Sequence, residues 1–333
     1  MLSQRRSDYD VTNTVQVSSP EAVHNAVIRL FNDIYPDSSL DYVDQAFTDF
    51  RLLFTGKAPG YLGCDTVYHD IQHTLDMTLA LARLIAGHEK SQKPNAKLGL
   101  HRATFGIITA LFHDAGYIRR EDDDEHKNGA EFTRFHVTRS ASFLANYLPT
   151  IGLPEAAEIA ARIVHFTGFE IKFDDIVVEN PLDRKVGYLV GTADLIAQMA
   201  DRCYLEKCRD RLYHEFVLGD VAVQQDTDGS QHVKYKSGLD LLRQTPAFFE
   251  GIRAERLDGE FGGAYHYIEV LYDGDNPYLD AIDRNLQYLT SALNTGSWPV
   301  LRREPPCFAW EHEPVENIQR LSKEHLDKLK MAS

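Results

Sequence analysis

The sequence has few cysteines, and none of them lies in a spacing typical of metal or redox sites. The four are Cys64, Cys203, Cys208 and Cys307, and no two of them form a C-x-x-C pair. This spacing excludes a zinc finger and gives no sign of a disulfide framework. We therefore interpret all four as reduced thiols.

Long apolar segments and an excess of positive charge are also missing. No apolar run reaches the roughly 18 residues of a transmembrane helix, and residues 1–8 contain no signal-peptide core. The formal net charge is −15, with 50 acidic and 35 basic residues, and no basic stripe could neutralise several phosphates. We expect a cytoplasmic protein that binds neither membranes nor long nucleic acids. A small anionic substrate still fits, if metal charge is concentrated in one pocket.

Helical periodicity dominates the rest of the chain. Ser19-Pro20-Glu21 is typical of a helix start, and apolar residues recur at helical spacing between Leu40 and Leu53. We expect further helices over residues 67–87, up to 113–114, 130–148, 154–166, 186–199, from about 237, and over 278–293.

The expected fold is therefore all-α, a helical bundle with a possible small β-hairpin over residues 221–235. The turn of that hairpin falls at residues 226–229, Asp-Thr-Asp-Gly. We divide the chain into a flexible segment over residues 1–18, a single helical domain over 19–298 and a peripheral tail over 299–333.

His113 and Asp114 stand side by side at the end of an apolar run that begins at Phe105. Burying an imidazole and a carboxylate costs free energy unless something binds them. A divalent cation satisfies both groups, because neutral imidazole and carboxylate are common metal ligands. For this pair alone, a His-Asp hydrogen bond that caps a helix is an equally good interpretation.

Other apolar stretches each carry one similar group. His69 and His73 are four residues apart, which predicts that they share one face of a helix about 6 Å apart. His136, His165 and Asp194 each lie in a separate expected helix. Any one of these groups would more often be an ordinary core residue, but one ligand per helix suits two adjacent metals in a bundle.

This pattern resembles the HD superfamily of metal-dependent phosphohydrolases, whose signature is a His, a His-Asp pair and a later Asp. The corresponding residues here are His73, His113, Asp114 and Asp194. His136 and His165 resemble the additional ligands of the two-metal branches, which include cyclic-di-GMP phosphodiesterases and diiron oxygenases. The resemblance implies an HD-type helical bundle that binds one or two divalent ions.

A second resemblance concerns residues 68–73, Tyr-His-Asp-Ile-Gln-His, which are similar to a motif of the cyclic nucleotide phosphodiesterases. The first His of that motif is the general acid, which implies this role for His69. Residues 214–220 look like another stretch of those enzymes. Gln244 and Phe248 resemble their base-binding Gln and stacking Phe, although helix capping and core packing are the commoner roles of such residues.

We accordingly predict a metal-dependent phosphohydrolase that cleaves a phosphate ester, foremost a cyclic or other nucleotide phosphodiester. The metal, one or two ions of Mn, Fe, Co, Ni or Zn and less readily Mg, would activate a water molecule, and Asp114 would be essential. His69 would protonate the leaving oxygen. Two alternatives stay open: an HD-type diiron oxygenase with the same ligands, and a metal-bound regulatory domain without catalysis.

Overall fold

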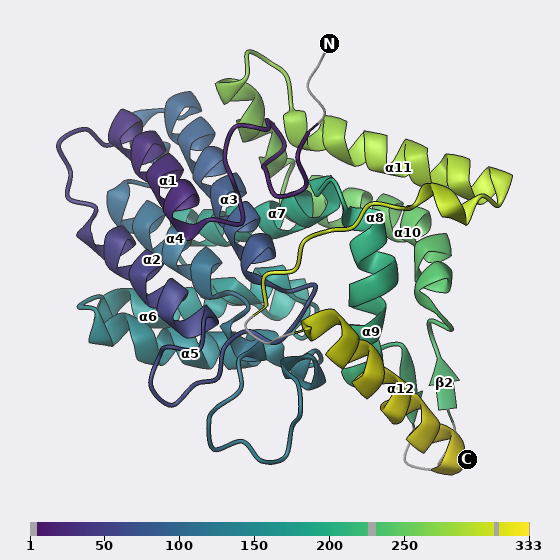
Figure 1. Cartoon of the computed structure of the whole chain (residues 1–333). Helices are drawn as coiled ribbons and strands as arrows, with labels where there is room; N and C mark the ends of the chain where they lie inside the picture. The colour runs from purple at the N-terminus through teal and green to yellow at the C-terminus, as the bar shows by residue number, and fades with distance from the viewer. Residues whose placement is uncertain (1–4, 226–230, 310–312, 333) are drawn as a thin grey trace.

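The fold is all-α with one small hairpin, as the sequence predicts (Figure 1). The structure, a computed structural model, describes residues 5–225, 231–309 and 313–332. The helices in the first half are α1 (Pro20–Ile34), α2 (Asp41–Phe54), α3 (Ile71–Ser91), α4 (Leu100–Phe112), α5 (His136–Thr150) and α6 (Pro154–Ile163). Those in the second half are α7 (Pro181–Ala200), α8 (Tyr204–Lys207), α9 (Tyr213–Leu218), α10 (Gly238–Ile252), α11 (Pro277–Thr295) and α12 (Pro314–Ala332). No helix in the described ranges is both long and apolar enough to cross a bilayer.

The hairpin pairs β1 (Val223–Gln225) with β2 (Gln231–Val233) in antiparallel register, with Val223 opposite Val233. It lies inside the predicted range of 221–235. The turn predicted at residues 226–229 lies outside the described residues.

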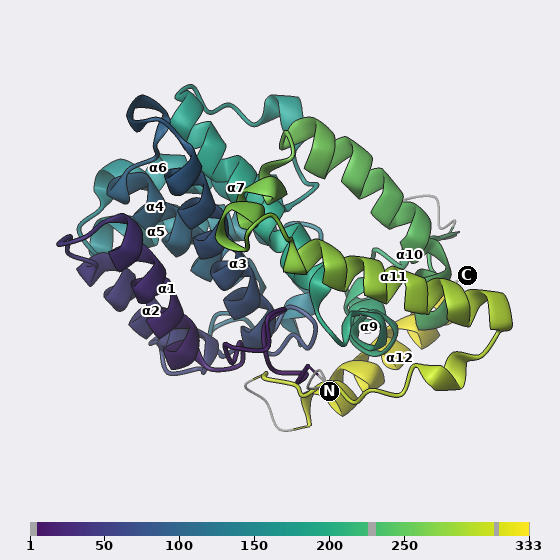
Figure 2. The same ribbon diagram turned by 90° about the horizontal axis from the view of Figure 1, so that it is seen from above.

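Helix α3 forms the centre of the molecule. Every residue from Gln72 to Glu89 is buried, because α3 packs against α1, α4 and α7. A helix surrounded in this way needs apolar or small residues on all its faces, and the segment Leu-Ala-Leu-Ala over residues 79–82 supplies them. Helix α7 lies on one side of α3 and separates α1–α6 from α10 and α11 (Figure 2).

Residues 5–18, which we expected to be flexible, fold against this core, whereas residues 1–4 lie outside the described part. Asp10 is fully buried and forms an ion pair of 2.6 Å with Arg83 of α3. The same carboxylate accepts hydrogen bonds from the backbone N–H groups of Thr12, Thr14 and Val15. A partner 73 residues away holds the segment in place, and no local pattern reveals such a partner.

This ion pair gives a stability prediction. Asp10→Asn should lower the free energy of unfolding at pH 7 by about 3 kcal/mol, because Arg83 stays buried without a counter-charge. Burial alone would raise the pKa of Asp10, but Arg83 and the hydrogen bonds from Thr12 and Val15 lower it from 3.8 to about 2. Since the folded pKa lies below the unfolded one, the contribution is present above about pH 4 and is lost as the pH falls towards 2.

Chemical denaturation of the wild type and Asp10→Asn between pH 7 and pH 2.5 measures this effect. We expect the difference between the two proteins to shrink in acid. The exposed Asp33 provides a matched control, because Asp33→Asn should change the stability by less than about 0.5 kcal/mol at any of these pH values. A difference that is small at pH 7, or constant with pH, would show that the pair does not stabilise the fold.

The C-terminal tail, predicted to be peripheral, packs beside the start of α3. Arg211 donates hydrogen bonds to the carbonyl groups of Pro305 and Pro306, and the N–H of Phe308 donates to Asp70 Oδ2 at 3.2 Å. Helix α12 packs along α9, where Ile318 and Leu321 join a small cluster with Val67 and Leu218. In Figure 1 the tail crosses the face of the molecule between α11 and α12. The segment therefore belongs to the folded body.

Candidate metal centre

Four of the predicted ligands converge where α3, α4 and α7 meet. His73 Nε2 lies 3.4 Å from Asp114 Oδ2 and 3.3 Å from Asp194 Oδ1. His113 Nε2 lies 3.1 Å from the same oxygen of Asp114 and 3.8 Å from that of Asp194. Helix α3 contributes His73 from its first turn, His113 and Asp114 follow the last residue of α4, and Asp194 lies within α7.

The atoms that face one another in this cluster are buried and have no hydrogen-bond partner among the residues that the structure describes. His113 Nε2, Asp114 Oδ2 and Asp194 Oδ1 are all unpartnered, although each is shielded from water. Leaving such groups unpaired costs free energy, so their clustering needs a partner. A cation satisfies all of them together, and His73, His113 and Asp114 alone already form a buried group of metal-binding character.

The spacing and orientation of the side chains also suit a cation. Two ligands that each bind one ion at about 2.1 Å are separated by roughly 3.0–3.4 Å, and the distances from His73 and His113 to Asp114 lie in this range. The Nδ1–H of His113 donates to the carbonyl of Ala110 at 2.7 Å. This bond fixes the ring so that Nε2 faces the carboxylates, as metal-binding histidines require.

Protons compete with a cation for this cluster. Burial lowers the pKa of His113, but Asp114 and Asp194 raise it more, to about 9. Burial raises the pKa of Asp114, but His113 above all holds it well below its usual range. Metal binding must therefore displace a proton, and the affinity for metal should increase with pH up to about 9.

His136 lies beside the four ligands. Its Nε2 is 3.8 Å from Asp114 Oδ1, the oxygen that does not face His73 and His113. Its Nδ1–H donates to the carbonyl of Thr133 at 2.7 Å, which again turns Nε2 towards the cluster. Burial lowers the pKa of His136 more than Asp114 raises it, so the ring is held neutral, as a metal ligand must be.

His165 and Glu170 lie further out. Among the described residues, His165 forms no hydrogen bond or ion pair with the cluster, and its buried Nδ1 is unpartnered. Burial lowers its pKa, and Glu170 partly opposes this shift. Glu170 also accepts the N–H groups of Val137 and Thr138 and lies 3.7 Å from Nδ1 of His136. Among the described residues, His136 is therefore the one of the two predicted additional ligands that lies within 4 Å of the cluster, through Asp114.

His69 does not lie on α3, contrary to the prediction from its spacing to His73. Helix α3 begins at Ile71 after its N-cap Asp70, which accepts the N–H of His73 at 3.1 Å. His69 precedes this cap. Its ring is nevertheless 5.6 Å from that of His73, measured between centroids.

Glu215 of α9 explains this departure. Its side chain is fully buried, and Oε1 accepts the N–H groups of Val67 and Tyr68 at 2.7 and 2.6 Å. The other oxygen, Oε2, lies 2.5 Å from Nδ1 of His69. Burial lowers the pKa of His69, but Glu215 raises it more, so the imidazole holds a proton above its ordinary pKa of 6.5. In the sequence, Glu215 is part of the stretch over residues 214–220 that resembles the cyclic nucleotide phosphodiesterases, and nothing there indicates its contact with His69.

Tyr117 was not identified from the sequence as a site residue. Its ring is stacked between two imidazoles, with centroid distances of 4.6 Å to His69 and 4.3 Å to His136. Its side chain is buried, and its hydroxyl lacks a hydrogen-bond partner. Stacking of this kind depends on how the backbone brings separate segments together, and no sequence spacing reveals it.

The two predicted substrate-binding residues lie elsewhere. Gln244 and Phe248 belong to α10, which packs against α9 and α11 and forms no comparable packing with α3, α4 or α5 in the described part of the chain. Gln244 donates its amide to the carbonyl of Lys234 beside the hairpin, and Phe248 is exposed. These contacts give no support to a base-binding pair at the cluster.

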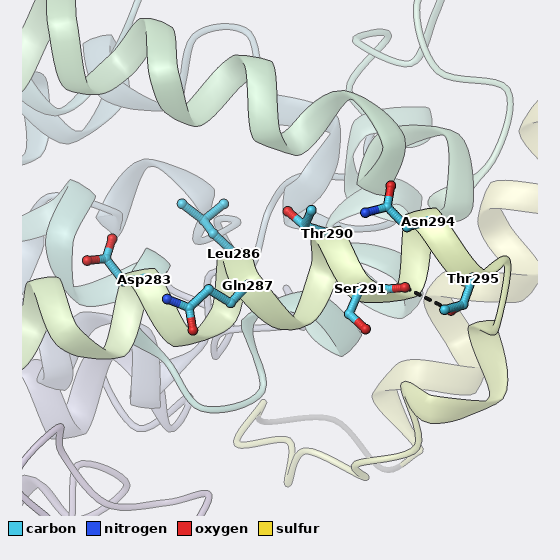
Figure 3. A pocket seen from close by; sticks show the side chains of 7 residues that line it. All are labelled: Asp283, Leu286, Gln287, Thr290, Ser291, Asn294 and Thr295. Atoms are coloured by element: carbon cyan, nitrogen blue, oxygen red, sulfur yellow. Dashed lines mark hydrogen bonds between the residues drawn. The ribbon is translucent and has the colours of Figure 1, made fainter.

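A shallow groove of about 530 Å³ lies on α11 (Figure 3). All seven side chains that line it come from this one helix: Asp283, Leu286, Gln287, Thr290, Ser291, Asn294 and Thr295. It contains a single ionisable group, and none of the predicted ligands, so it is separate from the metal centre.

Gly116 allows the turn after Asp114 to pack tightly on α5. A Cβ atom there would lie 1.8 Å from the carbonyl oxygen of His136 and 2.9 Å from Cβ of Arg139. Gly116→Ala should therefore lower the free energy of unfolding by about 3 kcal/mol and weaken metal retention, because the turn must move away from α5.

Urea denaturation and metal analysis of the purified protein test this prediction. Gly251→Ala is the matched control, because its Cβ position in α10 meets no described atom within 4 Å other than those of its chain neighbours and its own helix backbone. This control should gain roughly 0.5–1 kcal/mol from its helical backbone. A Gly116→Ala protein as stable and metal-rich as the wild type would contradict the close packing.

Comparison with known proteins gives one match. A family model described as Npun_R2479-like matches residues 121–274, which is less than half of the chain. The matched stretch includes His136, His165 and Asp194 but begins after Asp114. No curated protein and no solved structure matches the chain. The match says what this part of the chain is similar to and assigns no reaction to it.

Proposed function

We propose that the protein is a metal-dependent phosphohydrolase that cleaves a phosphodiester, with nucleotide phosphodiesters as the expected substrates. One observation supports the proposal: a buried group of side chains that could hold a cation lies in ring contact with an imidazole that a carboxylate holds in a fixed orientation. The cluster contains His73, and the imidazole is that of His69, bound to Glu215. Hydrolysis of a phosphodiester needs an activated water molecule and a proton for the leaving oxygen, which these two parts would supply.

The residues divide the work as follows. His73, His113, Asp114 and Asp194 would hold a divalent cation, which supplies an activated water molecule and offsets charge on the phosphoryl oxygens. Glu215 accepts the Nδ1–H of His69 and so leaves Nε2 as the atom that donates a proton to the leaving oxygen. Tyr117, stacked on His69, keeps the plane of the donor ring fixed.

A second candidate function is supported by the position of His136. Asp114 presents one oxygen to His73 and His113 and the other to His136, so Asp114 and His136 would help to hold a second ion beside the first. A two-metal centre also serves the diiron oxygenases that the HD resemblance includes. The proton donor next to the cluster favours hydrolysis over O₂ chemistry, because an oxygenase has no need of a leaving-group acid.

The proposal is tested by incubating the Mn²⁺-loaded protein with a panel of phosphoesters. The panel consists of cyclic mononucleotides, cyclic dinucleotides, nucleoside monophosphates and bis(p-nitrophenyl) phosphate, and chromatography follows the products. Turnover that chelation abolishes and Mn²⁺ restores supports the proposal and names the substrate class. If no phosphoester is cleaved, the proposal is wrong. Bound iron with O₂ uptake would then identify an oxygenase, and metal without either activity a regulatory domain.

A further inference from the structure

A second hollow lies behind the turn that carries His113 and Asp114. Its volume is about 780 Å³, within the roughly 300–1,000 Å³ of pockets that bind small molecules. It is lined by α2, the loop over residues 58–61, the turn over residues 115–118 and α5, and it opens to solvent. Ala115 and Gly116 form part of its wall, while the side chain of Asp114 points to the opposite side, towards α3 and α7. This cavity is thus separate from the candidate metal centre formed by His73, His113 and Asp114.

The inner surface of this cavity is apolar and aromatic. Leu53, Phe112 and Phe143 line it, and the rings of Phe112 and Phe143 are 5.1 Å apart. Tyr147, also in the lining, stacks on Phe143 at 5.6 Å. Apolar surface of this kind gains free energy when a ligand covers it.

Arg139 contributes positive charge to the wall of the cavity. Arg139 is partly buried, donates to the carbonyls of Gly116 and Ile118, and lies over the ring of Phe132. None of the ion pairs among the described residues includes Arg139. Burial lowers its pKa more than the nearby Asp123 raises it, and Asp123 is itself bound by His126.

Arg120 is a second arginine in the lining, and like Arg139 it lies near Tyr61. Its Cζ lies 4.4 Å from the ring of Tyr61, which also lines the cavity, and its side chain is about half exposed. Its ion pair with Asp122 spans 3.9 Å, and Asp122 is 87% exposed, so solvent screens the pair. The cavity therefore has two guanidinium groups whose counter-ions are weak or absent, although the chain has a net charge of −15. Such a local concentration of positive charge attracts an anion.

The acidic group at the cavity is already occupied. Both oxygens of Asp49 accept from Gln45, at 2.9 and 3.0 Å, and one of them also accepts the hydroxyl proton of Tyr147 at 2.8 Å. Asp49 is therefore satisfied and does not neutralise the arginines. The cavity as a whole has an apolar floor and two arginines in its lining.

We propose that this cavity binds a small amphiphilic anion, with an alkyl or aromatic body on Phe112 and Phe143 and a carboxylate at Arg120 and Arg139. A neutral apolar ligand would leave Arg139 without a counter-ion and Arg120 with only its solvent-screened contact to Asp122. A highly charged ligand would gain nothing from the aromatic floor. Binding at this site does not depend on the reaction proposed for the metal centre.

The test uses 11-(dansylamino)undecanoate, a fluorescent amphiphilic carboxylate, titrated into the full-length protein. We expect a saturable rise in fluorescence with one probe bound per chain. Decanoate should displace the probe, and decanol, which has the same chain without the charge, should not do so at the same concentration. A signal that never saturates, or displacement by decanol as effective as by decanoate, would overturn the proposal.

Three variants locate the binding site. Arg120→Glu should raise the dissociation constant at least about tenfold through charge reversal, and Ser142→Trp should block the cavity from its exposed rim on α5. Arg284→Glu on the exposed face of α11 makes the same change in net charge and should bind like the wild type. Arg120→Lys should retain most of the affinity, and circular dichroism checks that all variants are folded. Equal affinity in Arg120→Glu, Ser142→Trp and the wild type would show that the probe binds elsewhere.

Discussion

Replacing Asp114 with asparagine should abolish metal retention and reduce phosphodiester hydrolysis at least about 1,000-fold. The expected loss corresponds to about 4 kcal/mol of transition-state stabilisation, the order that a bound cation contributes. We expect so large an effect because one oxygen of Asp114 faces both His73 and His113 while the other faces His136. Asparagine keeps the shape of the side chain but loses the charge that the cation needs.

Thermal unfolding with and without Mn²⁺ measures this prediction independently of catalysis. A ligand present at 100 times its dissociation constant stabilises a protein by about 2.7 kcal/mol, so the wild type should unfold at a clearly higher temperature with metal. Asp114→Asn should show no such shift. Asp124→Asn, a control in the exposed loop ten residues on, should bind metal and turn over substrate like the wild type. If Mn²⁺ raised the unfolding temperature of Asp114→Asn as much as that of the wild type, Asp114 would not be a metal ligand.

Glu215→Gln should lower kcat about 100- to 1,000-fold for substrates with poor leaving groups and change it little for bis(p-nitrophenyl) phosphate. General acids typically contribute 10²–10⁴-fold, and p-nitrophenolate leaves without help from an acid. The glutamate holds Nδ1 of His69 at 2.5 Å and is the main cause of the raised pKa of this imidazole. Removing its charge lowers the pKa of His69, so the alkaline limb of the pH–rate profile should move to lower pH.

A double-mutant cycle separates this positioning role from a general loss of structure. If Glu215 acts through His69, adding Glu215→Gln to His69→Asn should cost little further activity. The exposed Glu158 of α6 provides the control, since Glu158→Gln should leave both kcat and the pH profile unchanged. Additive losses in the double mutant, or a loss of kcat that is the same for both leaving groups, would contradict the assignment.

The features of the fold that depend on local sequence were predictable. Ser19 and Pro20 mark the start of α1, and the spacing from Leu40 to Leu53 matches α2. The apolar stretch around Asp194 is indeed buried within α7. Where caps and periodicity agree, the helix that they predict also forms, because burial of its apolar face provides most of its stability.

The sequence-based predictions that the structure does not support concern residues whose positions depend on contacts between distant segments. The spacing of His69 and His73 predicts one helix, but Glu215, 146 residues from His69, binds the N–H groups that would have started it earlier. The resemblance of Gln244 to a base-binding residue is one of sequence only, and α10 packs mainly on other elements than those that carry the predicted metal ligands. His113, Asp114 and Asp194 drew attention because each places an ionisable group in an apolar stretch, and the HD resemblance added His73 to them. The structure brings these four side chains together, which the sequence spacing alone does not require.

The start of α3 forms hydrogen bonds both with a segment near the N-terminus and with the C-terminal tail. Gln72 donates to the carbonyl of Ser7, 65 residues earlier, and Asp70 accepts from Phe308, 238 residues later. A ribosome releases the chain from its N-terminus, so a nascent chain that has reached residue 300 already carries every predicted ligand but not this last bond. His73 acquires its final surroundings only after residue 308 has been synthesised. The order of translation therefore sets the earliest moment at which the candidate metal site is complete.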